Sequence, residues 1–165
     1  MNISIGNLMI TSFCSKNINH LKFRKELKQD EYIYEFVTID IEKDLIEATS
    51  EEKIEIDNSY IIQDNDKLVG YICLKPMYEE KDIVELRYAV HPEYRRLNYG
   101  KQILEECRNY LLSFNYINDL ELHIRKDNNA SIGCAEKAKY KRIGENDLEY
   151  YYIYRAIKGV DNSEN

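Results

Sequence analysis

The pattern of apolar and polar positions becomes regular about one third of the way along the chain. β-branched and aromatic residues crowd residues 59–63 and 67–76. The polar turn DNDK between them suits a left-handed backbone, so the two runs predict a β-hairpin. A third run at residues 82–90 predicts another strand, because it is rich in strand-forming residues and Pro92 prevents it from continuing.

A helical period replaces the strand pattern after the third run. Apolar side chains recur at the spacing of one buried helix face at Tyr99, Ile103, Leu104, Cys107 and Leu111. A strand at residues 119–124, a short helix at 130–138 behind the cap candidates Asn128 and Asn129, and a tyrosine-rich strand at 148–156 follow. The central strand–helix–strand unit implies a parallel pair joined by a right-handed crossover. We therefore expect an α/β (α+β) fold, with a mixed, mostly antiparallel sheet flanked by helices.

The first third of the chain has a weaker pattern. A mixed segment covers residues 3–13, a helical pattern follows at 18–28, and an acidic helical stretch runs over 41–52. No low-complexity linker interrupts the sequence. A length of 165 residues suits one domain, which we expect over residues 1–158, with 159–165 as a frayed polar tail.

Composition and charge narrow the class of protein. The hydrophobic share of 44% and the charged share of 32% are ordinary for a domain with one buried core. A net charge of -7 disfavours nucleic acid as a partner and suits cationic acceptors such as amines. No segment approaches the roughly 18 consecutive apolar residues that span a bilayer, and the start lacks the basic region of a secretory signal. We expect a cytoplasmic protein without a membrane partner.

The cysteines and histidines are too scattered to suggest a metal site or a disulfide framework. The four cysteines are Cys14, Cys73, Cys107 and Cys134, and the three histidines are His20, His91 and His123. No pair of cysteines has CxxC spacing, so each is expected to be a small hydrophobic residue, and no metal is expected.

The strand-to-helix junction VHPEYRRLNYGKQIL has the features of an anion site. The first N–H groups of a helix have no helical acceptor, and the helix dipole favours negative charge there. Asn98 and Gly100 allow the backbone to approach a phosphate closely, and Arg95, Arg96 and Lys101 add positive charge. The alternative is that these cations are simply solvated at a surface loop. The junction contains neither GxxxxGK[ST] nor GxGxxG, which disfavours a P-loop or a dinucleotide site.

The same junction resembles the acetyl-CoA-binding motif of the GNAT acetyltransferase superfamily. That motif runs V-x-P-x-x-(R/Q)-x-x-G-x-G/A between a strand and a helix. Val90, Pro92, Arg95 and Gly100 occupy its positions, and Asn98 replaces the first glycine. Asparagine also adopts left-handed conformations, so the motif tolerates this replacement.

A second stretch, IRKDNNASIGCAEKAKYKRIGE, is similar to the second signature of that superfamily. There an asparagine opens a helix, which ends in a Gly-Phe pair before a strand. Asn128 and Ser131 match, whereas Lys139 and Tyr140 stand where Gly-Phe is usual. The usual tyrosine acid, seven residues after the asparagine, is Ala135 here.

The resemblance covers residues 59–156 and implies a GNAT-like fold with acetyl-CoA as co-substrate. The central parallel pair would splay into a V-shaped cleft, with helices on both faces of the sheet. Residues 1–58 would form the variable part that shapes the acceptor pocket. The cofactor-binding residues implied are Tyr88, Ala89, Val90, Arg95, Arg96, Leu97, Asn98, Tyr99, Gly100, Lys101, Asn128, Ser131 and Cys134. For Asn128 the alternative is a plain helix cap.

The chemistry implied is direct attack of a primary amine, on a small molecule, peptide or protein, on the thioester. Glu85 is the candidate base, unless it faces solvent on an alternating strand. Tyr140 is the candidate acid, although its position suggests packing. Cys134 could carry an acyl group, but no histidine or acid pattern supports that.

Two other functions compete. A catalytically impaired acyl-CoA-binding regulatory or sensor module is favoured by the missing tyrosine at Ala135 and opposed by Glu85. An ordinary phosphate-binding α/β domain is the third possibility. An exposed edge at the closing strand would make a homodimer plausible.

Tyrosines crowd the closing strand. Alternation places Tyr150, Tyr152 and Tyr154 on one face, and Tyr151 with Ile153 on the other. Most are expected to pack in the core. One or two, with Tyr152 and Tyr154 as the candidates, could line an acceptor pocket and hold a cationic amine by cation–π contact.

Overall fold

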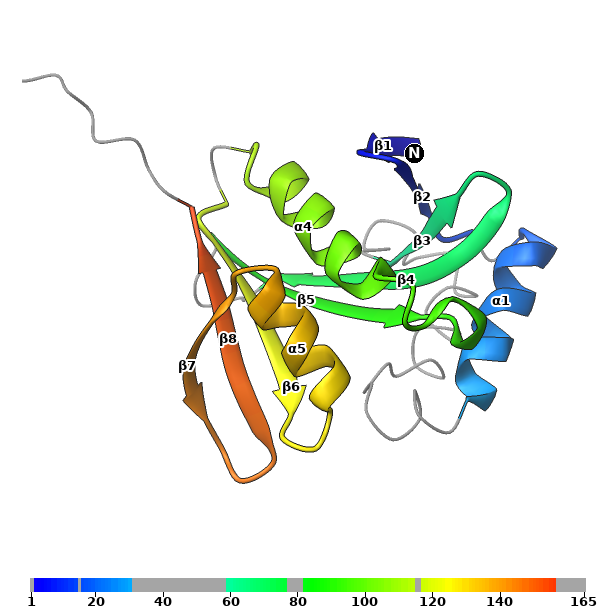
Figure 1. The fold of residues 1–165 in the computed structure, drawn as a ribbon. Coiled ribbons are helices and arrows are strands. Elements are labelled where there is room, and N and C mark those ends of the chain that lie inside the picture. The colour runs from blue at the N-terminus through cyan, green and yellow to red at the C-terminus, as the bar shows by residue number, and fades with distance from the viewer. Residues whose placement is uncertain (1, 15, 31–58, 77–81, 115–116, 157–165) are drawn as a thin grey trace, which may run out of the picture.

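The computed structural model describes residues 2–14, 16–30, 59–76, 82–114 and 117–156 (Figure 1). The predicted helix at 41–52 and the predicted tail at 159–165 lie outside these residues. The strands are β1 (Asn2–Ile5), β2 (Leu8–Ser12), β3 (Ser59–Asp64), β4 (Lys67–Pro76), β5 (Ile83–Val90), β6 (Asp119–Arg125), β7 (Lys141–Glu145) and β8 (Glu149–Arg155). The helices are α1 (Ile18–Gln29), α4 (Tyr99–Leu111) and α5 (Asn129–Lys137), with a 3-10 turn at Pro92–Tyr94.

The strands of the described residues form one sheet in the order β1-β2-β3-β4-β5-β6-β8-β7. All neighbours are antiparallel except β5 and β6, which are parallel and joined through α4. The predicted hairpin is β3 and β4, and Asn65 in its turn has φ 51°. The predicted mixed, mostly antiparallel sheet is therefore confirmed.

Three strands were not predicted from the sequence, and one of them, β7, corrects the expectation that the closing strand is a sheet edge. β1 and β2 form a short hairpin in the mixed N-terminal segment, and β7 has the sequence KRIGE, whose side chains are almost all exposed. A short, charged strand with no buried face has no apolar alternation to reveal it. Because β8 pairs with both β6 and β7, the closing strand is not an edge, and β7 is the edge instead.

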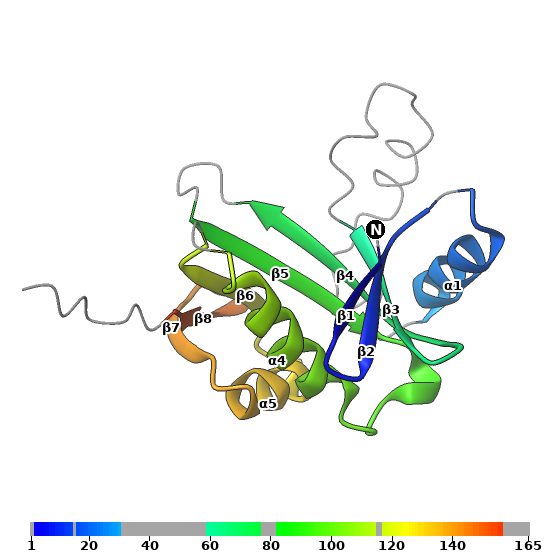
Figure 2. The same ribbon diagram turned by 90° about the horizontal axis from the view of Figure 1, so that it is seen from above.

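The two faces of the sheet pack against different helices, as predicted. On the α4 face, α4 and α5 cover the larger core, which includes Leu86, Leu104 and Leu120 (Figures 1 and 2). On the α1 face, a smaller core gathers Phe13, Phe23, Leu27, Ile61, Tyr71 and Ala89. Strand alternation assigns each side chain of β5 and β6 to one of these two faces.

The parallel pair separates after three residues. β5 and β6 are paired only at Ile83–Asp119, Val84–Leu120 and Glu85–Glu121. β5 stays paired with β4 as far as Val90, and β6 stays paired with β8 as far as Arg125. Residues 86–90 and 122–125 therefore diverge, as Figure 1 shows, and this is the predicted splay. We call its origin, at Glu85 and Glu121, the fork.

Leu120 tests the larger core beside the fork. Its side chain is fully buried on β6. Leu120→Ala should lower the free energy of unfolding by about 2–5 kcal/mol, because it removes buried methyl groups and leaves a cavity. Urea unfolding measures this change. The matched control Leu148→Ala, at an exposed leucine, should change stability by less than about 0.5 kcal/mol. Equal effects at the two positions would contradict the assigned core.

Candidate active site

The start of α4 presents backbone donors without a side-chain cap. Asn98 is the N-cap residue, in a left-handed conformation with φ 69°, and its side chain makes no capping bond. The first helical bond is donated by the Gln102 N–H to the Asn98 carbonyl at 3.1 Å. The N–H groups of Tyr99, Gly100 and Lys101 therefore precede the helical ladder, and they point out of the helix end. Such an end can accept an anion.

Close packing at Gly100 joins α4 to β5 and α5. A Cβ atom on Gly100 would lie 3.0 Å from the Cys134 Sγ and 3.5 Å from a ring carbon of Tyr88. The structure thus brings together three of the predicted cofactor residues, from three different elements. A larger residue at this position would push the helix end away from the strand.

Alternate residues of β5 direct their backbone N–H and C=O groups toward the splay. The His91 N–H donates to the Val69 carbonyl of β4 at 3.0 Å. Bonding alternates along an antiparallel pair, so Ala89 also bonds toward β4, whereas Tyr88 and Val90 direct their N–H and C=O groups toward β6. Of the three β5 residues predicted to bind the cofactor, Tyr88 and Val90 therefore have backbone groups on the side where the strands separate.

The predicted cations differ in their surroundings. Arg95 is held against α1, where its Nη2 lies 2.5 Å from the Oδ1 of Asp30, the residue that ends that helix. Lys101 contacts Glu105 one turn along α4, at 3.3 Å. Arg96, like Leu97, is exposed, and its φ is 63°. Arg95 therefore fixes the loop to α1.

The second signature caps α5. Asn128 is buried, and its Oδ1 accepts from the Ser131 N–H at 3.0 Å. This is the cap role that the sequence allowed, and it fixes Asn128 at the helix start. After the helix, Lys139 has φ 68°, the left-handed conformation for which glycine is usual.

Tyr140 lies in the core on the α4 face. Its ring centroid is 5.7 Å from that of Tyr154, and its buried hydroxyl has no hydrogen-bond partner among the described residues. Burial raises the pKa of this phenol well above its ordinary value. Ala135, in place of the usual tyrosine, is also fully buried. Tyr152 and Tyr154 belong to the same core, so an acceptor pocket that they line would have to lie on the α4 face.

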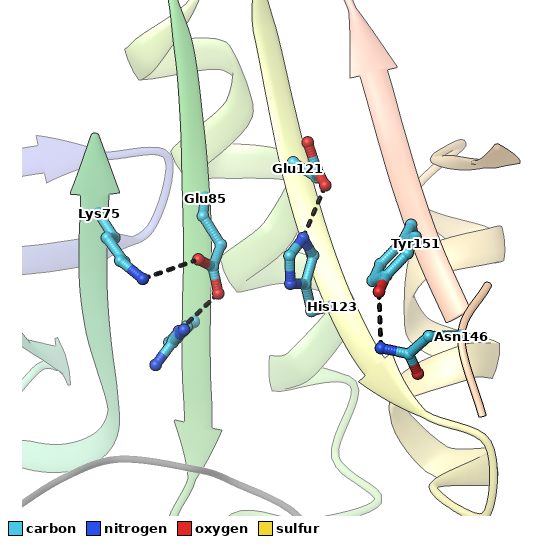
Figure 3. Close-up of polar contacts among 7 residues, drawn as sticks. Lys75, Glu85, Glu121, His123, Asn146 and Tyr151 are labelled. Carbon is cyan, nitrogen blue, oxygen red and sulfur yellow. Dashed lines mark hydrogen bonds and ion pairs between the residues drawn. The ribbon is translucent and has the colours of Figure 1, made fainter. Parts of the chain in front are cut away.

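Glu85 lies at the fork (Figure 3). Its side chain is on the α1 face, because strand alternation places it opposite Leu86 and Tyr88, which pack in the core on the α4 face. It is only 2% exposed, so it does not face solvent. The Nε of Arg87 donates to its Oε1 at 2.6 Å, and the Lys75 Nζ lies 3.9 Å from its Oε2. Burial is the largest single influence on the Arg87 pKa and lowers it, but the hydrogen bond and the charge of Glu85, with smaller contributions from other acidic groups, together hold that pKa above its ordinary value.

A second polar group on the same face was missed by the sequence analysis. The His123 Nε2 lies 2.6 Å from the Glu121 Oε1, both on β6 (Figure 3). The Tyr151 ring packs on His123 with centroids 4.7 Å apart, and the Asn146 amide donates to the Tyr151 hydroxyl at 2.6 Å. Glu121 and His123 alternate with Leu120, Leu122 and Ile124, and this alternation was the available signal.

Among the described residues, no group of three or more His, Cys, Asp or Glu side chains could hold a metal ion. No helix in the described part of the chain is long and apolar enough to cross a membrane.

The family model for the acetyltransferase (GNAT) family matches residues 22–140, which is more than half of the chain. The chain belongs to the GNAT acetyltransferase family. Members of this family are acyl-CoA-dependent enzymes. The matched region contains the α4 junction, the fork and the second signature as far as Tyr140.

Solved GNAT structures have the same fold at low sequence identity. An acetyltransferase of the family from Bacillus anthracis superposes with a TM-score of 0.77 at 17% identity, over 94% of this chain and 98% of that one. A spermidine N-acetyltransferase from Vibrio cholerae, in complex with CoA and spermine, gives 0.73 at 13%, over 90% and 95%. An aminoglycoside acetyltransferase in complex with coenzyme A and kanamycin gives 0.72 at 14%, over 90% and 94%.

Lys139 tests the departure from the second GNAT signature. A left-handed conformation costs a residue with a Cβ about 1 kcal/mol relative to glycine, so Lys139→Gly should stabilise the protein by about that amount. The melting temperature should rise by about 2–4 °C. The control Lys137→Gly, within α5, should have the opposite sign, because glycine weakens a helix. A loss of stability in Lys139→Gly would contradict the assigned conformation.

Proposed function

We propose that this GNAT protein transfers an acetyl group from acetyl-CoA to a primary amine of a small molecule, peptide or protein. The observation that carries the proposal is the fork, where the β5–β6 ladder ends at a buried carboxylate, Glu85. At the other end of the splay, beyond Val90 and against Tyr88, α4 begins without a side-chain cap. A place for an anionic cofactor at the helix end and a place for a cationic acceptor at the fork are thus joined by the splayed part of β5.

The residues present fit acetyl-CoA. The N–H groups of Tyr99, Gly100 and Lys101 would hold the pyrophosphate, because they precede the helical ladder. The backbone groups of Tyr88 and Val90 would pair with the pantetheine arm, because they point into the splay. When bound, acetyl-CoA supplies the thioester carbonyl that the amine attacks.

The acceptor would approach from the α1 face. On the other face, the core beneath α4 and α5 fills the space over β5 and β6. On the α1 face, Glu121 contacts an imidazole and offers negative charge at the fork, beside Glu85, which is paired with Arg87. A net charge of -7 also favours a cationic partner. The complexes of the structural relatives with spermine and kanamycin support an amine as acceptor.

The amine must lose a proton before it can attack. An alkylammonium with a pKa near 10.4 is neutral in only about one molecule in a few thousand at pH 7, which costs roughly 4–5 kcal/mol. Glu85 is the predicted base, but both of its oxygens face cations, so a proton that reaches it has to compete with Arg87. We assign Glu85 the task of attracting the ammonium to the fork, where it takes part by charge or through water.

The alternative, an impaired acyl-CoA sensor, is less well supported. It rests on the missing tyrosine at Ala135, a fully buried position. A sensor has no use for a buried carboxylate fixed by Arg87 at the fork. Burying even a paired charge can cost more free energy in desolvation than the pairing returns, and the chain nevertheless retains it.

Cofactor binding is tested by thermal stabilisation. Acetyl-CoA, CoA and ADP are compared at one concentration. A ligand present at about 100 times its Kd adds roughly 2.7 kcal/mol to the stability of the folded state. Acetyl-CoA and CoA should raise the melting temperature well beyond ADP, because the splay adds contacts to pantetheine that ADP lacks. Equal shifts for all three would indicate an ordinary phosphate-binding site, and no shift would contradict the cofactor assignment.

Glu85→Gln tests the role of the fork in turnover. Thiol release from acetyl-CoA is followed with a panel of amines: spermine, kanamycin and a lysine-containing peptide. The variant should lose about 100-fold or more in kcat/KM for the amine, because the charge that attracts the ammonium is gone, and it should keep its thermal response to CoA. Glu145→Gln is the matched control, because Glu145 is an exposed carboxylate paired with Lys126 and far from the fork in the sheet order. Full activity in Glu85→Gln would refute this role.

A further inference from the structure

We propose that His123, positioned by Glu121, is the base that removes the proton from the acceptor amine. The inference rests on the proposed acetyl transfer and adds a catalytic residue to it. It starts from the Glu121–His123 pair on β6, which has no role in binding the cofactor as assigned above.

The pair lies where the base is needed. Glu121 is the last residue of β6 that pairs with β5, opposite Glu85, and His123 lies two residues further on, where the strands have separated. Both side chains are on the α1 face, as is that of Glu85 (Figure 3). Their side chains are only 15% and 25% exposed, so they are sheltered without being closed off.

The hydrogen bond to Glu121 selects the useful tautomer. A carboxylate only accepts, so the Oε1 of Glu121 takes the Nε2–H of His123 at 2.6 Å. In the neutral ring the lone pair is then on Nδ1, and among the described residues no hydrogen-bond partner reaches that atom. The carboxylate also stabilises the imidazolium that forms when the proton arrives. Glu121 is therefore a positioning residue.

Tyr151 completes the arrangement. Its ring packs on the imidazole with centroids 4.7 Å apart, and its hydroxyl accepts from the Asn146 amide. The imidazole is thus held by a hydrogen bond on its own strand and by a ring from β8. A group fixed in this way needs little reorganisation when the proton is transferred.

His123 suits proton transfer better than Glu85. The carboxylate of Glu85 is bonded to Arg87 and lies near Lys75, so a proton must displace a cation from it. The imidazole of His123 contacts a carboxylate instead, at 2.6 Å. The two groups therefore divide the work: Glu85 attracts the ammonium and His123 takes its proton.

The step balances as follows. The ammonium N–H bond breaks, and its proton goes to the Nδ1 of His123 and from there to water. The amine lone pair forms the C–N bond to the thioester carbonyl carbon, and the C–S bond breaks with its electron pair on sulfur. The second proton lost from nitrogen passes through His123 to the leaving thiolate. The products are an amide, CoA and one proton.

The experiment compares amines of different basicity. kcat and KM are measured for wild type, His123→Gln, Glu121→Gln and the control Glu145→Gln. The strongly basic amines are spermine, kanamycin and a lysine-containing peptide, and the weakly basic one is glycinamide. His123→Gln should lower kcat about 10²–10⁴-fold with the strongly basic amines, and much less with glycinamide, of which far more is already neutral. The KM for acetyl-CoA should not change.

Two further measurements make the test independent of folding defects. Glu121→Gln keeps the shape of the side chain and should lower kcat less than His123→Gln does. Added imidazole should restore part of the activity of His123→Ala, which a purely structural role would not allow. Each variant should retain its thermal response to CoA.

The outcomes separate the two proposals. An active wild type with an equally active His123→Gln overturns the role of His123 and leaves the acetyl transfer standing. An equal loss with all amines and no imidazole rescue overturns it as well, and assigns His123 to packing. A wild type that binds acetyl-CoA but releases no thiol with any amine overturns the proposed function, and this inference with it.

Discussion

The site depends on one constraint in the sheet, namely that β5 pairs with β6 for only three residues. A strand that leaves its neighbour inside a sheet presents backbone groups that an extended ligand can pair with, as an added strand would. At the open end of this splay, beyond Val90, α4 begins, and its first N–H groups precede the helical hydrogen bonds. The backbone alone thus provides donors for both ends of a long anionic cofactor.

Strand alternation places apolar side chains on one face of the fork and polar side chains on the other. Leu86, Leu120 and Leu122 bury on the α4 face and hold the helix that would bind the cofactor. Glu85, Glu121 and His123 point the other way, where an acceptor would arrive. Because the side-chain period of a strand is two, a slip of one residue in register would exchange these roles. The short parallel ladder therefore fixes the chemistry as well as the fold.

Elements with a strong apolar periodicity were predicted from the sequence, whereas contacts between residues far apart in the chain were not. The β3–β4 hairpin and α4 were found because their apolar spacing is regular, and the left-handed Asn98 was anticipated from its motif position. The bond from Arg95 to Asp30 joins residues 65 positions apart, and no local pattern signals it. The Glu121–His123 pair was overlooked because two polar residues on an alternating strand are usual at a solvated face.

The absence of the usual tyrosine acid at Ala135 should slow this reaction less than the absence of a base would. A thiol with a pKa near 8.5 leaves as thiolate at pH 7 at a cost of about 2 kcal/mol, whereas deprotonating an alkylammonium costs roughly 4–5 kcal/mol. The larger cost lies on the amine side. There the α1 face provides a carboxylate and an imidazole–carboxylate pair, while the position of the usual acid is a buried alanine. The polar groups of the chain are thus concentrated where the energetic demand is greater.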